Sequence, residues 1–416
     1  MHQRSRIDIL IVLLVIGIAL IPRLQVAMSN QSAPESDEHT YDKYAWSFAL
    51  NEGRTEKGKY IYHPLGSFTY RPPGYPLFMG LIYKVSGHNY QAVRVAQALL
   101  GAVSCGLLYG IGRLVFGRLV GALAALLMAG YGLLIQFTGW LLSETLFIFL
   151  LLLFIWMALV AAQDGDKRAV FLTGVGLGLA TITRPVGLPM IPLLLAWLLF
   201  SRPFRRRMWT NIGLLLLALA LTMGPILVKN YQIHGKPVLI STHGGITFWR
   251  GLLKGGASKD PTLKDARDRI GHSGLPELEQ EKRYYQVAFD YLRRYPEDIP
   301  MILRRKFEQL MFHVSEEYTI AHKPMRVPGD PIMWRLIMGL SVLGLFLYPR
   351  WHLHQRLLLY GVILTQIAVT LVYDSTVRYR VPLVPPMALL ACYAVVCLVG
   401  WVLTRNPLRH PWLTER

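Results

Sequence analysis

The chain has 416 residues, of which 53% are hydrophobic and 17% are charged, and its apolar residues come in long uninterrupted blocks. This composition is typical of an all-α polytopic membrane protein. The net charge of +19 would fit a nucleic-acid partner. However, the basic residues lie in short loops between apolar blocks and form no stripe interleaved with aromatic residues, which excludes nucleic acid.

Ten apolar blocks are candidates for membrane-spanning helices, each of which needs about 20 mostly apolar residues. The block at 170–182 is short and would have to tilt or extend, so the count carries an error of about two. An even count places both termini on one side of the membrane. The blocks cover residues 7–22, 95–116, 119–135, 145–162, 170–182, 186–200, 212–228, 332–348, 357–373 and 381–403.

Basic residues identify the cytoplasmic loops, because short loops rich in Lys and Arg stay inside. They fall on alternate loops, so we expect both termini in the cytoplasm. The first block could also be a cleaved signal, given the small residues of "QVAMS" at 25–29, but we expect a retained helix because a structured loop follows it. The basic positions are Arg4, Arg6, Arg113, Arg118, Lys167, Arg168, "SRPFRRR" at 201–207, Arg350, Arg356, Arg405 and Arg409.

The remaining loops are then expected to face outward, and they divide the chain into three parts. The first is an N-terminal transmembrane region, 1–228, which contains a long first outward loop at 23–90. The second is a loop region at 229–331, where "EKRYYQVAFDYLRRYP" at 281–296 predicts a helix with Tyr285, Ala288, Phe289 and Leu292 on one face. The third is a C-terminal transmembrane region, 332–416.

The stretch "SDEHTYDKYA" at 36–45 begins a predicted helix in the first outward loop. Ser36 is a candidate N-cap, Asp37 and Glu38 would occupy the first turn, and Tyr41 follows on the face of Asp37, with Gly53 ending the helix. Acidic residues favour a helix N-terminus, so capping alone could explain both carboxylates. The alternative is that one of them belongs to a site on the outward face.

Two further charged residues support such a site. Glu144 stands in "WLLSETLFIFLL", at the outer end of an apolar helix, where a carboxylate either faces a cavity or reaches water at the interface. Arg71 precedes two prolines in "YRPPGYPLFMGLIYKVSG". The prolines predict a helix start and Gly87 its end. This helix could lie in the outer interface, with Arg71 at the depth of a lipid phosphate.

These motifs, in this order, resemble the C-type (GT-C) bacterial membrane glycosyltransferases. The resemblance is to the branch that includes the family 39 protein mannosyltransferases and the aminoarabinose transferase acting on lipid A. It extends to "TRP" at 183–185, "KNYQIHGKPVLISTHGGITFWRG" at 229–251 and "RYRVPLVPPMALLA" near the end. It implies an enzyme of the bacterial inner membrane that moves a sugar from a polyprenyl-phosphate donor to a lipid, glycan or protein acceptor on the outer face, with inversion.

The resemblance also implies roles for residues. The family's loop-one aspartate, the candidate general base, matches Asp37, with Glu38 as the alternative, and its second outward carboxylate matches Glu144. Arg71 stands where the lipid A branch has a lysine that contacts the donor phosphate, and a guanidinium can replace it. A bound divalent metal is a less favoured hypothesis, and Asp37 and Glu144 would be its ligands. Further candidates for substrate binding are Tyr41, Arg184, His243 and Arg378, although each could be an interfacial anchor or plain polar surface.

Two other functions are compatible with parts of the sequence. A transporter or flippase of lipid-linked sugars would place charges near the bilayer midplane and often shows internal repeats. Here the charges fall at the ends of the apolar blocks. A noncatalytic scaffold would explain the large loop at 229–331, but not the gathering of Asp37, Arg71 and Glu144 at one membrane face.

Overall fold

Each predicted apolar block contains a helix in the computed structural model, which describes residues 2–50, 69–200, 207–315, 317–320, 323–347 and 353–404. The all-α polytopic class is therefore confirmed. The helices are α1 (His2–Ser29), α4 (Tyr90–Phe116), α5 (Arg118–Gly130) with α6 (Gly132–Gln136), α7 (Glu144–Asp164), α8 (Lys167–Thr183), α9 (Met190–Phe200), α10 (Met208–His234), α16 (Asp330–Phe346), α17 (Leu353–Val372) and α19 (Val384–Thr404).

Not every one of these helices is long enough to span a bilayer by itself. Among the described residues, five pass on length and hydropathy, namely those in α1, α4, α7, α10 and the segment ending in α19. A sixth is obtained if α5 and α6 count as one span, although they meet at a bend of 58°. This bend could not be predicted from the sequence, because the apolar block continues through it without a proline.

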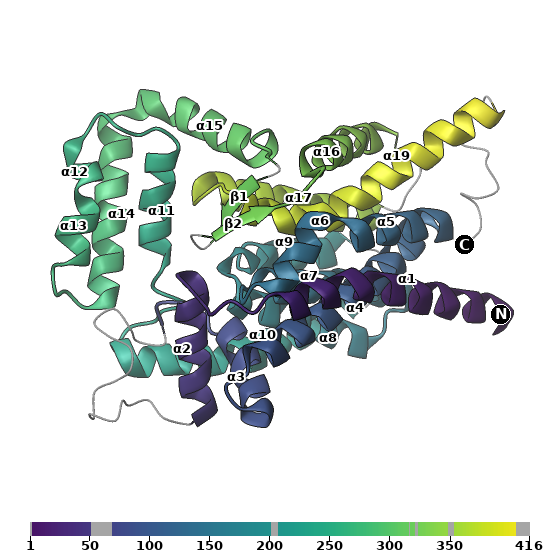
Figure 1. The fold of residues 1–416 in the computed structure, drawn as a ribbon, viewed down its shortest axis with the longest axis horizontal. Coiled ribbons are helices and arrows are strands. Elements are labelled where there is room, and N and C mark those ends of the chain that lie inside the picture. Colours follow the sequence, from purple (N-terminus) through teal and green to yellow (C-terminus); the bar gives the residue numbers. More distant parts are fainter. Residues whose placement is uncertain are drawn as a thin grey trace.

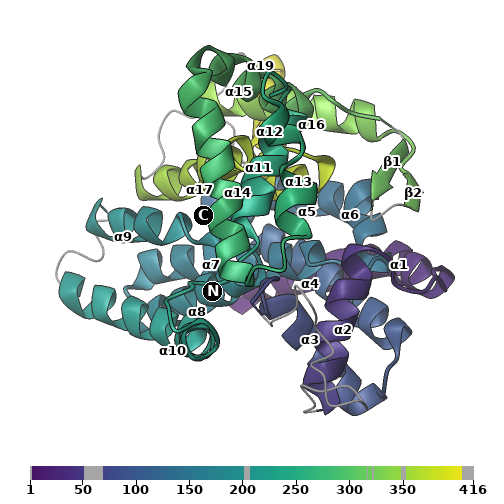
Figure 2. The same cartoon turned by 90° about the vertical axis from the view of Figure 1, so that its left-hand side faces the viewer.

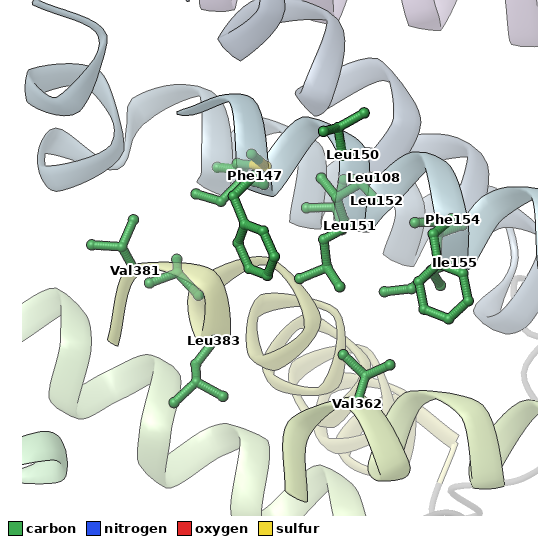
Figure 3. Packing of buried hydrophobic residues seen from close by; sticks show 14 of the residues in the cluster. Leu108, Phe147, Leu150, Leu151, Leu152, Phe154, Ile155, Val362, Val381 and Leu383 are labelled. Atoms are coloured by element: carbon green, nitrogen blue, oxygen red, sulfur yellow. The ribbon is translucent and has the colours of Figure 1, made fainter. Parts of the chain in front are cut away.

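Helix α7 lies at the centre of the bundle, which explains why its sequence is apolar on all sides. Side chains of α7 face Leu108 of α4, Val362 of α17 and the segment Val381–Leu383 before α19 (Figure 3). Small residues bring other helices together, as is common in membranes. A Cβ at Gly174 of α8, for example, would lie 2.7 Å from the Cβ of Ala218 in α10.

Most of the region between α10 and α16 packs around a second apolar cluster, from Phe248 to Ile302, whereas residues 310–327 contribute side chains to the main core. The region contains α11 (Gly244–Lys254), α12 (Pro261–Lys264), α13 (Ala266–Gly271), α14 (Glu277–Arg294) and α15 (Ile299–Met311), followed by a hairpin of β1 (Glu317–Ile320) and β2 (Lys323–Arg326). The predicted face of α14 is partly wrong. Tyr284, Ala288 and Tyr291 are buried, whereas Phe289 is 47% exposed, so the buried face is rotated from the expected one.

The two ends of the bundle differ. The start of α1 and the end of α19 lie at the right of Figure 1, and α11–α14 lie at the left together with α2 (Asp37–Leu50). We call this left end the loop end. Figure 2 looks onto it, with α11–α14 nearest the viewer and α2 below them. The predicted helix end at Gly53, most of the basic run at 201–207, and Arg350, Arg405 and Arg409 lie outside the described residues.

The helix predicted after Arg71 is present as α3 (Gly74–Ser86), ending at Gly87 with a φ of 71°. Its side chains divide between two surroundings. Tyr75, Met79 and Tyr83 are buried against the protein, whereas Leu81 and Val85 are 59% and 92% exposed. An exposed apolar face is what a helix lying in a membrane interface needs.

Candidate active site

Asp37 is the first residue of α2, and the chain turns sharply to present it. Ser36 has a φ of 51°, which residues other than glycine seldom adopt. This places Asp37 at the positive end of the helix dipole, where a carboxylate is favoured. Its side chain remains 24% exposed, so a substrate can reach it.

Five charged residues of alternating sign meet at the loop end. Arg71 Nη2 donates to Asp37 Oδ1 at 2.5 Å, and Arg378 Nη1 donates to Asp37 Oδ2 at 2.6 Å. Arg378 Nε donates to Glu144 Oε1 at 2.6 Å. The same oxygen lies 2.8 Å from Arg184 Nη1. We call this set, Arg71, Asp37, Arg378, Glu144 and Arg184, the charge network.

The charge network carries three cations and two carboxylates in a largely buried place. Glu144 is fully buried, and the side chains of Arg184, Arg71 and Arg378 are 11%, 15% and 20% exposed. Burial alone would raise the pKa of Asp37, but the charges of Arg71 and Arg378 outweigh it and hold the pKa below its usual range. Asp37 is therefore ionised and weakly basic while both arginines bind it.

His243 and two tyrosines surround Arg71. Arg71 Nη1 lies 3.3 Å from His243 Nε2, and its guanidinium lies over the rings of Tyr41 and Tyr70, at 5.8 and 5.5 Å from their centroids. Burial, together with the charges of Arg71 and Arg250, lowers the pKa of His243 well below its usual value. His243 is therefore neutral at neutral pH and can accept the hydrogen bond from Arg71.

Several buried polar atoms of this site have no hydrogen-bond partner among the described residues. They are Arg71 Nε, His243 Nδ1 and Glu144 Oε2. Buried polar atoms in proteins are nearly always paired, so unpaired ones in a cluster need an explanation. Two donors and one acceptor at one place are suited to a bound polar ligand.

Close packing of glycine brings two parts of the charge network together. A Cβ at Gly74, the first residue of α3, would lie 2.5 Å from Thr183 Oγ1 at the end of α8. Arg71 lies shortly before Gly74, and Arg184 directly follows Thr183. The contact therefore holds the start of α3, next to Arg71, against the end of α8, next to Arg184. The glycine in "RPPG" is thus required by packing.

Glu38 points elsewhere. It is 1% exposed, and its Oε1 accepts a hydrogen bond from the backbone N–H of Leu141 at 2.8 Å. Leu141 lies just before α7, so Glu38 fixes the segment that leads to Glu144. Of the two neighbouring carboxylates, it is Asp37 that binds Arg71 and Arg378.

Arg378 is the residue whose place the sequence predicted least well. It was one of several outward arginines, yet it bridges the two carboxylates across separations of 341 and 234 residues. A divalent metal fits these residues poorly, since Arg378 lies where a cation shared by Asp37 and Glu144 would bind. The described residues also contain no group of three or more His, Cys, Asp or Glu side chains suited to a metal ion.

Comparison with known families gives one match. The family described as dolichyl-phosphate-mannose-protein mannosyltransferase matches residues 70–228. This segment is less than half of the chain, and it includes Arg71, Glu144 and Arg184 but not Asp37 or Arg378. A comparison with curated proteins finds no match.

Solved structures are similar at low sequence identity. The oligosaccharyltransferase of Archaeoglobus fulgidus tethered with an acceptor peptide has a TM-score of 0.59 and 13% identity, over 95% of this chain and 50% of that chain. The archaeal oligosaccharyltransferase AglB from the same organism, in complex with an inhibitory peptide and a dolichol-phosphate, has a TM-score of 0.58 and 14% identity, over 97% of this chain and 51% of that chain. The present chain thus spans about half the length of that enzyme.

A weaker similarity, with a TM-score of 0.41 and 15% identity over 92% of this chain and 77% of that chain, is to ArnT from Cupriavidus metallidurans bound to undecaprenyl phosphate. At these identities the comparisons concern the fold. The chain shares its fold with the archaeal oligosaccharyltransferase, and at the level of the fold the resemblance to the C-type membrane glycosyltransferases is confirmed.

Proposed function

We propose that this protein is a membrane glycosyltransferase that takes a sugar from a polyprenyl-phosphate donor. The observation that carries the proposal is the charge network, in which Arg71 and Arg378 bind the partly exposed Asp37 while Arg378 and Arg184 bind the buried Glu144. Arginine binds phosphate through paired hydrogen bonds, and a site with surplus positive charge attracts it. The matching family is described by its dolichyl-phosphate donor, and AglB was solved with a dolichol-phosphate, which supports the same class of donor.

Donor binding would change the partners of Asp37. In the structure, Arg71 and Arg378 each give a hydrogen bond to Asp37. A donor phosphate would compete for the same guanidinium groups, and Arg71 Nε has no partner among the described residues. As the arginines turn to phosphate, the pKa of Asp37 rises and the carboxylate becomes a better base. The base is then active when the donor is present.

The reaction follows as a single displacement. The acceptor's hydroxyl or amine attacks the anomeric carbon, its proton passes to Asp37, and the bond from that carbon to the phosphate oxygen breaks. The electron pair of this bond leaves with the phosphate, whose growing charge is stabilised by Arg71 and Arg378. One displacement inverts the anomeric configuration. Glu144 holds Arg378 and Arg184 in place, and its unpaired Oε2 can accept a substrate hydroxyl.

We place the reaction on the outer face of a bacterial inner membrane. Arg113 and Arg118 bind Asp8 at the opposite end of the bundle from α2, and short basic loops remain in the cytoplasm. Cysteine labelling tests this placement. Cysteines introduced at the exposed positions Ser258 and Lys264 should react with an impermeant reagent only from outside, and labelling from the cytoplasm would contradict the placement.

A flippase is the less favoured alternative. Asp37 and Glu144 are the first residues of α2 and α7, and Arg184 follows the last residue of α8. Charges at helix ends are suited to a reaction at one face, whereas a transporter binds its cargo near the midplane.

The deciding experiment is transfer by purified protein in nanodiscs. Polyprenyl-phosphate-linked sugars would be incubated with the protein and with a glycolipid and protein extract from a strain lacking it, followed by mass spectrometry. We expect sugar on an acceptor and free polyprenyl phosphate with the wild type, and neither with Asp37→Asn. Equal product from wild type and variant with every donor would contradict the proposal. Flipping of the donor without cleavage would favour the transporter.

A further inference from the structure

A second polar site lies next to the charge network, and the proposed reaction does not use it. It is a cavity of about 290 Å³. One wall is the segment directly before Arg378, and another is the end of α15. The lining residues include Lys254, Gln309, His313, Tyr318, Ser375 and Thr376.

Cations gather beside this cavity. Lys254 Nζ lies 3.0 and 3.1 Å from the two carboxylate oxygens of Asp374, and Arg250 Nε lies 3.4 Å from one of them. Lys306 is buried and donates to the backbone carbonyls of Val372 and Tyr373, directly before Asp374. Two cations thus contact the Asp374 carboxylate and a third lies against the backbone directly before it, which leaves positive charge to attract an anion.

Two of these cations are accessible. The side chains of Lys254 and Arg250 are 37% and 44% exposed, whereas that of Asp374 is 2% exposed. A lysine ammonium has three hydrogens to donate, so Lys254 can bind a further group in the cavity while it pairs with Asp374. Hydroxyl and imidazole groups of Thr376 and His313 line the same space.

The cavity and the charge network are close but distinct. Arg250 contacts Asp374 on one side, and on the other its charge reaches His243, the partner of Arg71. In a single displacement, the attacking group and the leaving phosphate lie on opposite sides of the reacting carbon. Donor phosphate and acceptor therefore need separate places, and the charge network already has the arginines for one phosphate.

We propose that this cavity binds an anionic group of the acceptor, a phosphate or a carboxylate, through Lys254, which lines it, with Arg250 adding positive charge from its place beside Asp374. The proposal rests on the proposed function of the charge network. An acceptor held in this way carries its negative charge near the hydroxyl or amine that attacks. The site would select acidic glycolipids or glycans over neutral ones.

Inorganic phosphate is the probe, followed by ³¹P NMR on the full-length protein in nanodiscs of neutral lipid. We expect two classes of phosphate site in the wild type. Arg71→Met should weaken the donor class, and Lys254→Met should weaken the cavity class, each by at least about tenfold, as expected for a charge-assisted hydrogen bond. Lys259→Met is the matched control, because Lys259 is an exposed lysine of the same region paired with Glu297 and Asp298.

Added polyprenyl phosphate distinguishes donor from acceptor as the source of the anion. It should displace inorganic phosphate from the Arg71 class only. Displacement from both classes would assign the cavity to the donor and overturn the proposal. A single class that depends on Arg71 and not on Lys254 would also overturn it, while the proposed function would stand. If instead the wild type bound phosphate but Arg71→Met weakened no class of site, the result would count against the proposed function.

A second variant guards against unfolding. Lys254→Met leaves the buried Asp374 with fewer partners and could destabilise the fold. In Arg250→Met, the pair between Lys254 and Asp374 remains, and we expect the cavity class to weaken, by less than in Lys254→Met, because Arg250 lies beside the cavity and does not line it. Retention of the Arg71 class in either variant shows that the protein is folded. An unchanged cavity class in Arg250→Met and Lys254→Met would refute the assignment.

Discussion

Two arginines that are two residues apart have opposite surroundings in this protein. Both belong to α18 (Val377–Arg380), a single turn between α17 and α19. Arg378 is 20% exposed and binds Asp37 and Glu144. Arg380 is 1% exposed, lies 2.7 Å from Asp330 Oδ2 and stacks over Trp334 with its guanidinium 4.9 Å from the ring centroid.

Helix geometry explains the difference. Residues two apart on a helix point about 200° away from each other, so a single turn sends one arginine to the site and the other into the bundle. Arg380 joins α18 to α16 and to the hairpin, because its Nη2 also donates to the hydroxyl of Tyr318 at 2.8 Å. The buried pair thus fixes the turn, and the fixed turn presents Arg378. Of these two arginines, Arg378 belongs to the candidate site, and Arg380 stabilises the turn that carries it.

We expect the largest loss of sugar transfer from substitution of Asp37, one of the two carboxylates that bind Arg378. Asp37→Asn should lower transfer by about a hundredfold to ten thousandfold, the usual range for loss of a general base. Donor affinity should not fall, because Asp37 competes with phosphate for Arg71 and Arg378. Turnover and donor binding would be measured on the same nanodisc preparation. The matched control is Glu38→Gln, which alters the contact with Leu141 and should retain transfer; if it lost transfer and Asp37→Asn did not, the two roles would be exchanged.

Removing the buried arginine should act on stability. Arg380→Met leaves the buried Asp330 with the hydroxyl of Tyr318 but without its cation, and loss of one partner of a buried ion pair typically destabilises by about 3–5 kcal/mol. Thermal unfolding in detergent should show this loss, while turnover per folded molecule should fall far less than in Asp37→Asn, because Arg380 acts only through the turn that carries Arg378. The double variant Arg380→Met with Asp330→Leu should recover much of it. If Arg380→Met instead lowered turnover with no change in unfolding, Arg380 would belong to the site.

Three substitutions of Arg71 test the second arginine that binds Asp37. Arg71→Ala should lower donor affinity and turnover by about tenfold or more, since a charge-assisted hydrogen bond to phosphate is lost. Arg71→Lys should recover part of the loss and Arg71→Gln none, because only the former keeps the charge. Transfer from a purified polyprenyl-phosphate sugar is the measurement. Equal rates for the three variants would reduce Arg71 to an interfacial anchor.

The smallest expected effect is on the pH dependence of stability. The pKa of Asp37 is lower in the folded protein than in the unfolded chain, where it is about 3.9. The unfolded chain therefore binds a proton first, and the stability that Asp37 contributes at neutral pH is lost as the pH falls below about 4. Unfolding temperatures between pH 7 and pH 3 should fall more in the wild type than in Asp37→Asn. Parallel curves would show that Arg71 and Arg378 do not hold the carboxylate ionised.

Sequence reasoning predicted the helices well where the signal is local. Long apolar blocks gave α1, α4 and α7, and the prolines and Gly87 gave the bounds of α3 to within a few residues. It failed where the signal depends on phase or on a break within one apolar block. The buried face of α14 is rotated from the expected one, and α5 and α6 are separate helices that meet at 58°.

The same distinction between local and long-range signals holds for the candidate site. The sequence by itself determined that Asp37, Arg71 and Glu144 stand at the ends of helices expected on one face of a membrane, because helix ends and apolar lengths are local properties. Only the tertiary structure decided that Arg378 bridges the two carboxylates and that Glu38 turns to Leu141. These contacts join residues more than a hundred positions apart, so they depend on how α2, α7 and α18 pack, and packing is a property of the whole chain.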